Sequence, residues 1–274
     1  MPEPFRSAMP ESHPLPPYFG LLAVDVKDST RLPSIQHARL SRALTEIVHG
    51  GLELAGLKEM RREFESHSGD GLAFGFDPSL VPFAISPLAD VLNTLLLENN
   101  AGPGPHIRLR MSIHIGSVPR SPGLPGDGNA APRSETHRLL DSVPARNWLA
   151  RADAHATPLV LIVSDTVYRT VVVGDYCALP PTRFAEVLAE TEGKNFAQTA
   201  WIYVPSPSGE LLSRSDAQPA PELEPTEKAA ESVPTVPRSG ETRLQHVEFG
   251  VAVMDCNMGD FHHHAVPRQG PDRP

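Results

Sequence analysis

The sequence predicts an α+β fold: a ferredoxin-like sheet with the element order β-α-β-β-α-β, helices on one face and disordered termini. Two observations lead to this prediction. Short apolar runs, typical of strands, alternate with longer segments in which apolar residues recur at helical spacing. In addition, Gly69-Asp70-Gly71 separates two extended runs, and Asp-Gly between such runs is typical of a β-hairpin.

The first half of this fold begins with an apolar run that predicts a buried strand from Gly20 to Val26. A helix is expected from about Ser34 to Leu54, because apolar residues lie there at helical spacing: Leu40, Leu44, Ile47 and Val48. The hairpin covers residues 60–76. A second amphipathic helix covers residues 85–100 and ends at the Asn-, Gly- and Pro-rich sequence NNAGPGP.

The second half begins at residues 106–118, where polar and apolar residues alternate. This pattern predicts a strand with one water-exposed face that carries Arg108, Arg110, Ser112 and His114. A helix is expected over residues 134–152, with a kink or break at Pro144. A buried strand over 158–164, a short helix over 165–172 behind the cap residue Ser164, and a hairpin from residues 182–190 and 199–205 complete the domain.

Composition narrows the class of protein. The 274 residues carry a formal net charge of −9, which argues against a nucleic-acid surface. Two cysteines, Cys177 and Cys256, are too few for a disulfide framework and favour a reduced, cytoplasmic location, with Cys177 as a packed thiol. No apolar run approaches the roughly 20 residues of a membrane helix, and the N-terminal segment lacks the apolar core of a signal peptide.

Changes in composition along the chain predict four regions. Residues 1–17 are expected to be disordered, and residues 18–204 to form the globular domain. A linker rich in Pro, Ser and Glu follows over residues 205–242, because its composition cannot bury enough apolar surface to offset the entropy of ordering. Residues 243–274 form a tail that contains a short apolar segment.

The apolar segment of the tail, His246 to His264, allows several interpretations. It is either a motif that docks on a partner protein or pairs with copies of itself, or a C-terminal helix packed on the domain. The core Cys256-Asn257-Met258-Gly259 loosely resembles short amyloid-like signalling motifs. The histidines at 262–264 either bind a metal ion or belong to a solvated polar tail.

Two carboxylates mark the candidate site. Asp25 closes the first strand, and Asp70 lies in the turn of the hairpin. In this fold the first strand is central and pairs with the hairpin, so both side chains can reach the same end of the sheet. Each residue alone is typical of a turn or a helix cap. Together, and with the carbonyl of Val26, they favour a site for one or two Mg²⁺ ions, which take few protein ligands and leave room for phosphates.

Several segments resemble one protein family. LLAVDVKDST (residues 21–30) and HSGDGLAFGF (67–76) resemble the class III nucleotide cyclase catalytic domain, the adenylate/guanylate cyclase family. IRLRMSIHIGSV (107–118) resembles the family's strand before the substrate loop, and THRLLD (136–141) resembles its following helix. The similarity covers about residues 18–204, as in a divergent bacterial member.

This resemblance implies a reaction and an assembly. The reaction is attack of a ribose 3′-OH on the α-phosphate of a nucleoside triphosphate, which gives a 3′,5′-cyclic nucleotide and pyrophosphate with two Mg²⁺ or Mn²⁺ ions. The assembly is a head-to-tail homodimer with active sites at the interface. Asp25 and Asp70 match the metal ligands, Arg138 matches the arginine that stabilises the transition state, and Lys194 matches a triphosphate-binding lysine.

Other substrate contacts of the family are altered. Asp127 stands at the position of a base-reading aspartate, whereas Ser134 and Ser66 stand where the family has an asparagine and often a lysine. Three functions therefore stay open: an active cyclase in intracellular signalling; a catalytically degenerate domain that binds a nucleotide or a partner in a bacterial signalling or immune-type module; and an assembly adaptor that acts through its tail. The sequence does not identify the base.

Overall fold

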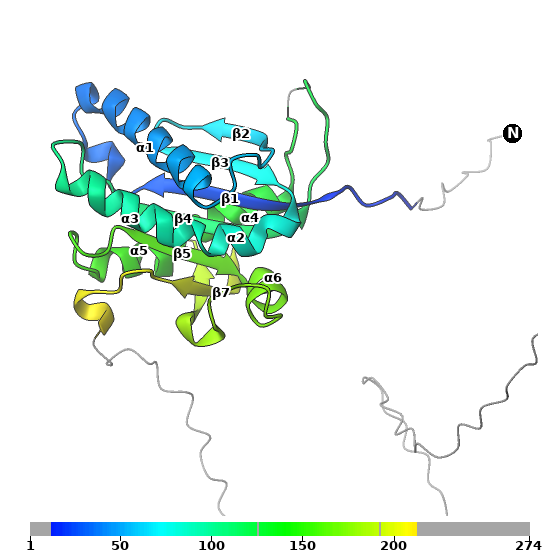
Figure 1. The fold of residues 1–274 in the computed structure, drawn as a ribbon. Coiled ribbons are helices and arrows are strands. Elements are labelled where there is room, and N and C mark those ends of the chain that lie inside the picture. The colour runs from blue at the N-terminus through cyan, green and yellow to red at the C-terminus, as the bar shows by residue number, and fades with distance from the viewer. Residues whose placement is uncertain (1–11, 125, 192, 213–274) are drawn as a thin grey trace, which may run out of the picture. The chain divides into compact units, whose positions relative to one another are not determined.

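The computed structural model describes residues 12–212, except 125 and 192. Within these residues, seven strands form one mixed sheet with the order β2-β3-β1-β4-β5-β7-β6 (Figure 1). The strands are β1 (Tyr18–Val26), β2 (Glu63–His67), β3 (Gly71–Phe76), β4 (Leu109–Ser117), β5 (Leu159–Ser164), β6 (Ala185–Glu190) and β7 (Ala197–Tyr203). The helices are α1 (Ser34–Leu54), α2 (Val81–Ile85), α3 (Leu88–Ala101), α4 (Ala131–Leu140), α5 (Val143–Arg151) and α6 (Asp165–Val167).

The first four strands form the predicted ferredoxin-like core. β1 lies between β3 and β4 and pairs antiparallel with both, while β2 pairs antiparallel with β3. β4 and β5 pair in parallel, and the β6–β7 hairpin extends the sheet beyond β5. The α+β class, the order of the core elements and the terminal hairpin are therefore as the sequence predicts.

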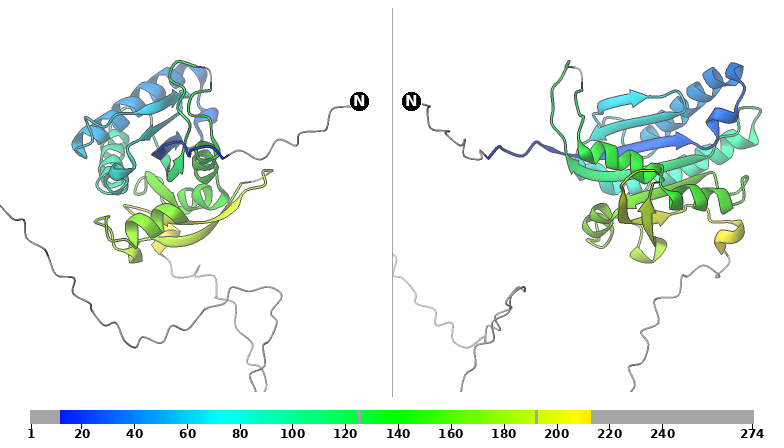
Figure 2. Two further views of the ribbon diagram at one scale, coloured as in Figure 1. Left: turned by 90° about the vertical axis from the view of Figure 1, so that its right-hand side faces the viewer. Right: turned by 180° about the vertical axis from the view of Figure 1, so that it is seen from behind.

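Helices cover both faces of this sheet. α1 and α3 pack on the first face, where Leu44, Leu92 and Met111 belong to the largest apolar cluster. α4 and α5 lie behind the sheet in Figure 1 and in front of it in the right-hand view of Figure 2. Their residues Leu139 and Leu149 pack with the opposite side chains of β5 and β7. The expectation of helices on one face thus holds for the core helices α1 and α3, and α4 and α5 add a second layer.

This second layer corrects one prediction. The polar side chains of residues 108–114 were expected to face water, because they alternate with apolar residues. Instead α4 and α5 cover them, so Ser112 is fully buried and His114 is only 7% exposed. Alternation shows that the two faces of a strand differ in chemistry, but a polar face can still be buried when helices supply hydrogen-bond partners.

Local signals at the ends of the elements are borne out. The predicted break at Pro144 separates α4 from α5, with Pro144 in the first turn of α5. Ser164 caps α6, because its hydroxyl accepts a hydrogen bond from Val167 N at 3.3 Å. Residues 168–172 continue α6 as a turn of π-helix. Cys177 is buried, and burial raises the pKa of its thiol.

The segments before β1 and after β7 both contact the folded domain. Pro16 O and Pro17 O accept hydrogen bonds from β4 and from the residue after it. Residues 206–212, which the sequence analysis assigns to the start of the linker, also contact the domain: Ser206 accepts a hydrogen bond from Asn93 at 2.8 Å, and Leu211 packs beside α5 and β7. The predicted tail motif and the histidines at 262–264 lie outside the described residues.

Among the described residues, no single helix is long and apolar enough to cross a membrane. The segment Pro78–Ile85 together with α3 passes such a test by length and composition, with a bend of 44° between the two parts. Ile85, Leu88, Leu92 and Leu96 of this pair are buried in the domain core, as expected for core helices of a folded domain.

Candidate functional site

Backbone pairing places Asp25 and Asp70 at one end of the sheet. Asp25, next to last in β1, lies opposite Gly71, the first residue of β3, and Val26 N donates a hydrogen bond to Asp70 O at 2.9 Å. A side chain at Gly71 would not fit, because its Cβ would lie 3.0 Å from Val24 O and 2.8 Å from Ser68 Oγ. The glycine after Asp70 therefore allows the hairpin to approach β1 closely.

Two hydroxyl groups hold the Asp70 carboxylate. Ser29, buried in the turn after β1, donates to Oδ2 at 2.6 Å, and Ser68 donates to Oδ1 at 3.0 Å. Desolvation alone would raise the pKa of Asp70, but these hydrogen bonds favour the charged form and lower it. Ser29, in the turn directly after β1, thus helps to fix an ionised carboxylate.

Asp25 has a different environment. Its Oδ2 forms an ion pair with Nη2 of Arg110, the residue directly opposite on β4. Burial raises the pKa of Asp25, Arg110 opposes this shift, and the negative charges of Asp70 and Asp141 add to it. The two carboxylates therefore differ: Asp70 is held by neutral donors, whereas Asp25 is held by a cation.

Both carboxylates line a cleft of about 630 Å³ beside α5. Positively charged side chains share this cleft: Lys27, Arg31, Arg110 and Arg146. A second cavity of about 180 Å³ lies between the β2–β3 hairpin and the end of α4, and Asp25, Ser66 and Asp141 line it. Two carboxylates that face a space lined by cations suit a ligand that carries both metal ions and phosphate groups.

Hard divalent cations fit this donor set. The described residues contain no group of three or more His, Cys, Asp or Glu side chains that could hold a metal ion. A metal ion in the cleft would therefore have two protein carboxylates as ligands, those of Asp25 and Asp70. Val26 lines the same cleft. Mg²⁺ commonly binds through one or two carboxylates, with water and substrate phosphates as its other ligands.

Arg138 and Lys194 lie apart from the two carboxylates. Neither residue lines either of the cavities that Asp25 lines. The Arg138 guanidinium lies over the ring of Phe196, 5.7 Å from its centre, and Lys194 is exposed two residues earlier in the β6–β7 connection. Ser134 is exposed near the start of α4. One chain thus brings Arg138 close to the connection that carries Lys194, and neither residue lines the cleft of the carboxylate pair.

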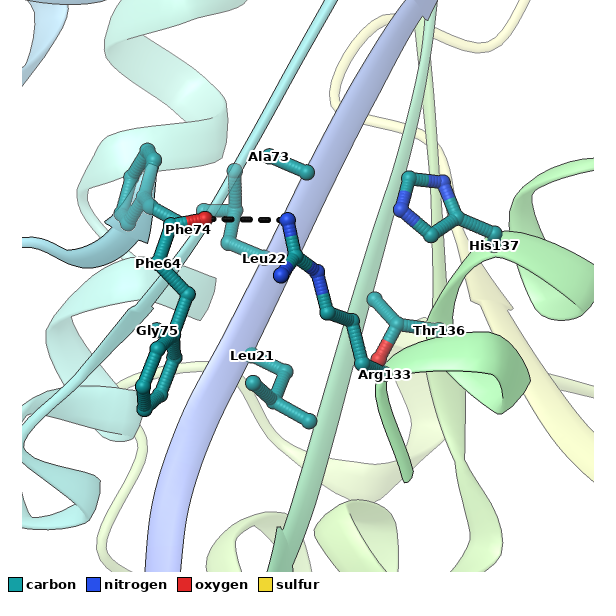
Figure 3. Close-up of a pocket in the computed structure, with 9 residues that line it drawn as sticks. All are labelled: Leu21, Leu22, Phe64, Ala73, Phe74, Gly75, Arg133, Thr136 and His137. Carbon is teal, nitrogen blue, oxygen red and sulfur yellow. Dashed lines mark hydrogen bonds between the residues drawn. The ribbon is translucent and has the colours of Figure 1, made fainter. Parts of the chain in front are cut away.

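Asp127 is engaged within its own loop. Its Oδ1 accepts a hydrogen bond from Ser121 N at 2.5 Å. Arg133, at the start of α4, donates to Asp127 O at 3.5 Å and to Phe64 O at 3.0 Å (Figure 3). Phe64 has a φ of 53° at an irregularity of β2, and its ring lies where a Cβ on Gly128 would stand. Phe64 and Arg133 therefore hold the Asp127 loop against the sheet, and Asp127 does not line the carboxylate cleft.

Sequence reasoning missed how the polar face of β4 binds α4 and α5. Arg108 donates to three carbonyl oxygens, those of Leu149, Ala152 and Thr157, at 2.7 to 3.2 Å. Ser112 donates to Thr136 O at 2.8 Å. His114 contacts Ser164 Oγ at 2.9 Å and Glu135 Oε2 at 3.2 Å. Charged or polar residues at every second position of β4 could have indicated buried hydrogen-bond partners on a covering helix instead of water. The pattern does not identify which residues those partners are.

The described domain was compared with solved protein structures. The fold of the described domain is similar to that of class III adenylyl and guanylyl cyclase catalytic domains at low sequence identity. A bacterial light-regulated adenylyl cyclase is 12% identical with a TM-score of 0.49, over 70% of this chain and 53% of that one. An adenylate/guanylate cyclase/hydrolase from Silicibacter pomeroyi is 17% identical with a TM-score of 0.46, over 69% and 98% of the two chains.

The guanylyl cyclase Cya2 is 14% identical with a TM-score of 0.46, over 70% of this chain and 93% of its own. No protein-family model and no curated protein sequence matches the chain. At these identities the similarity concerns the fold alone.

Proposed function

We propose that this protein is a nucleotide cyclase-like signalling protein that converts a nucleoside triphosphate to a 3′,5′-cyclic nucleotide and pyrophosphate. One observation carries the proposal: Asp25 and Asp70 lie on paired strands at one end of the sheet and line one cleft of about 630 Å³ together with four cationic side chains. This is the pair that the motif resemblance assigns to metal binding. Two Mg²⁺ or Mn²⁺ ions bound there would activate the ribose 3′-OH and neutralise the triphosphate.

The chain's own residues have distinct roles in this proposal. Asp70, ionised and fixed by Ser29 and Ser68, supplies a preorganised carboxylate. Asp25 supplies the second carboxylate when a divalent metal ion, which attracts a carboxylate more strongly than Arg110 does, binds beside it. Arg146, which lines the cleft, then offers its guanidinium group to phosphate oxygens, a pairing favoured by its planar geometry.

The active unit in this proposal is a homodimer. Arg138 and Lys194 lie outside the cavities of Asp25, so one chain does not hold a complete site. In a head-to-tail dimer, Arg138 and Lys194 of one copy would face the carboxylate pair of the other and offset charge that develops on the α-phosphate. Sedimentation at micromolar concentration tests this assembly, and a strictly monomeric active species would contradict it.

The reaction is tested by incubating the full chain with each of the four ribonucleoside triphosphates and Mg²⁺ or Mn²⁺, and identifying products by mass. We expect one or more cyclic nucleotides together with pyrophosphate. Asp70→Asn should abolish the product, because it removes a carboxylate from the metal pair. Asp28→Asn is the matched control, since Asp28 lines the same cleft but is exposed and paired with Lys27. Equal loss in both variants would contradict the assignment.

A second function has support in the same site: binding of a nucleotide without turnover. Arg110 already neutralises Asp25, and the carboxylate of Asp127 is engaged by Ser121 N rather than directed to a base. Calorimetry separates the two functions. Micromolar, Mg²⁺-dependent binding of a triphosphate without any product in the mass assay would favour the cyclase-homology domain that only binds.

A further inference from the structure

Arg110 lies between two carboxylates that belong to different parts of the fold. Its Nη2 pairs with Asp25, and its Nη1 donates to Asp141 Oδ1 at 3.3 Å and to Leu140 O at 3.4 Å. Asp141 directly follows α4, so Arg110 links the candidate metal site on β1 to the end of the helix that carries Arg138. Only 11% of the Arg110 side chain is exposed, against 25% of Asp25 and 39% of Asp141, so the guanidinium itself is largely shielded from water.

The link leaves one buried donor of Arg110 without a partner, and its contacts with Asp141 are long. Arg110 Nε is buried and has no hydrogen-bond partner among the described residues. On Asp141, both donors use the same oxygen: Oδ1 accepts from Arg110 at 3.3 Å and from Arg146 at 3.2 Å. The bonds to Asp141 are long, whereas charge-assisted pairs are usually about 2.7–2.9 Å. A second arrangement, in which the freed Nη2 joins Nη1 on Asp141, would pair both nitrogens with the two oxygens of that carboxylate.

We propose that Arg110 is the internal cation of the metal-free site, and that Asp141 is the positioning residue that receives it when a divalent cation binds Asp25. In this proposal the metal ion takes Oδ2 of Asp25, the oxygen that Nη2 of Arg110 holds, and the two positive charges then repel each other at short range. Metal binding therefore releases Nη2, and Asp141 already lies within reach of the neighbouring Nη1. Asp141 sets metal affinity without touching the metal, by stabilising the released state of Arg110.

This inference rests on the metal site of the proposed function, but not on turnover or on the identity of the base. It also connects the carboxylate pair with α4, the helix that carries Arg138. When Arg110 leaves Asp25, the tie between β1 and the end of α4 is exchanged for a closer tie between β4 and α4. The position of α4 would then depend on whether the carboxylate pair of the same chain holds a metal ion.

The test is Mn²⁺ binding to the full chain without nucleotide, measured by electron paramagnetic resonance of free Mn²⁺. Arg110→Gln removes the competing cation and should tighten binding about tenfold, the scale of one charge-assisted hydrogen bond. Asp141→Asn should weaken binding about fivefold, because Arg110 then keeps to Asp25. Asp141→Glu, which retains the carboxylate, should stay within about twofold of the wild type.

The double variant Arg110→Gln/Asp141→Asn separates this mechanism from simple loss of charge. If Asp141 acts through Arg110, Asp141→Asn should change affinity less than about twofold once Arg110 is absent. Asp28→Asn also removes one negative charge, from the larger cleft that Asp25 lines, and its effect should be equal in both backgrounds. Equal effects of Asp141→Asn in both backgrounds, or no tightening by Arg110→Gln, would overturn the proposal.

Two further measurements keep the outcome interpretable. Asp25→Asn should eliminate Mn²⁺ binding; if it binds as the wild type does, the metal site itself is wrongly assigned and both proposals fall. If Asp25→Asn eliminates binding but the effects of Arg110→Gln and Asp141→Asn simply add in the double variant, only the proposal about Arg110 and Asp141 is contradicted. In the wild type, Mg²⁺ should shift the side-chain Nε–H resonance of Arg110, which tests the release without any substitution; an unchanged resonance at saturation would contradict it.

Discussion

The two faces of β4 are both buried, yet their chemistry is opposite. Leu109, Met111 and Ile113 face α1 and α3 within the main apolar cluster. Arg110, Ser112 and His114 face the other way, toward α4, and make polar contacts with that helix at Leu140 O, Thr136 O and Glu135. The first face is a core held by burial of apolar surface, which has no directional preference. The second face is held by hydrogen bonds, which have direction, and it therefore determines where α4 lies.

This difference assigns separate roles to the two faces. Loss of an apolar contact should lower stability and leave the candidate site intact, whereas loss of a polar contact should also move α4. Since α4 carries Arg138 and Asp141 directly follows it, the placement of α4 matters for both the carboxylate pair and Arg138. Substitutions within this one strand can test the distinction.

The largest effect on stability is expected from Met111→Ala. Met111 lies on β4 and is fully buried against the α1–α3 layer. Truncation of such a side chain lowers the free energy of unfolding by about 3 kcal/mol, through lost transfer energy and a residual cavity. Urea unfolding measures the loss. Mn²⁺ affinity under native conditions should stay within about twofold of the wild type. A large change in affinity would show that the apolar face also positions the site.

The next effect is expected from Arg108→Met. The guanidinium of Arg108 satisfies three carbonyl oxygens at the end of α5 and before β5, and methionine would leave them buried without donors. We expect a loss of about 2 kcal/mol in the free energy of unfolding. Ser112→Ala, which removes the one hydrogen bond to Thr136 O, is the control and should cost about 1 kcal/mol. If Arg108→Met costs no more than Ser112→Ala, the polar face does not hold α5.

The apolar face is also the part of the fold that the sequence predicts well. Periodicity places the strands and helices of the core, and the predicted helix from about Ser34 to Leu54 matches α1. Gly69-Asp70-Gly71 places the hairpin turn, because a tight turn at Asp70 needs glycine beside it. Such signals are local: each depends on a few neighbouring residues, so one sequence suffices to find them.

The polar face could not be predicted in the same way. The pairing of Asp25 with Arg110 depends on the register between β1 and β4, which are 85 residues apart in sequence at this contact. The partners Glu135 and Asp141 lie on α4 and directly after it, and the packing of that helix is set by the whole sheet. Asp25 and Asp70 could be brought to one end of the sheet from topology, but the cation between Asp25 and Asp141 required the side-chain contacts.

A smaller effect concerns pH and His114. Burial lowers the pKa of His114, and the charge of Glu135 opposes this shift only in part. The unfolded chain therefore binds a proton more readily than the folded one. The contribution of neutral His114 to stability is complete above the unfolded pKa of about 6.5 and is lost as the pH falls from there toward the folded pKa.

Unfolding free energies measured between pH 7.5 and 5 on the wild type and on His114→Gln test this point. Glutamine can still donate a hydrogen bond to Glu135 but does not titrate, so the difference in stability between the two proteins should shrink on acidification. His49, His106 and His137 also have lowered pKa values and contribute equally to both proteins. A difference that does not change with pH would mean that His114 titrates normally.

The smallest effect is expected where the domain ends. Thr157, whose carbonyl binds Arg108, also donates a hydrogen bond to Ser206 O and contacts Ser208 Oγ at 2.6 Å, and Asp153 N donates to Ser208 Oγ at 3.1 Å. A chain that ends at residue 212 keeps these contacts and should match the full chain in unfolding free energy. A chain that ends at residue 205 loses them and should be less stable by about 1 kcal/mol, because Thr157 and Asp153 regain water as a partner. Urea unfolding of both truncated chains decides whether residues 206–212 act as part of the polar layer. Equal stability would place the functional end of the domain at β7, as the sequence alone predicts.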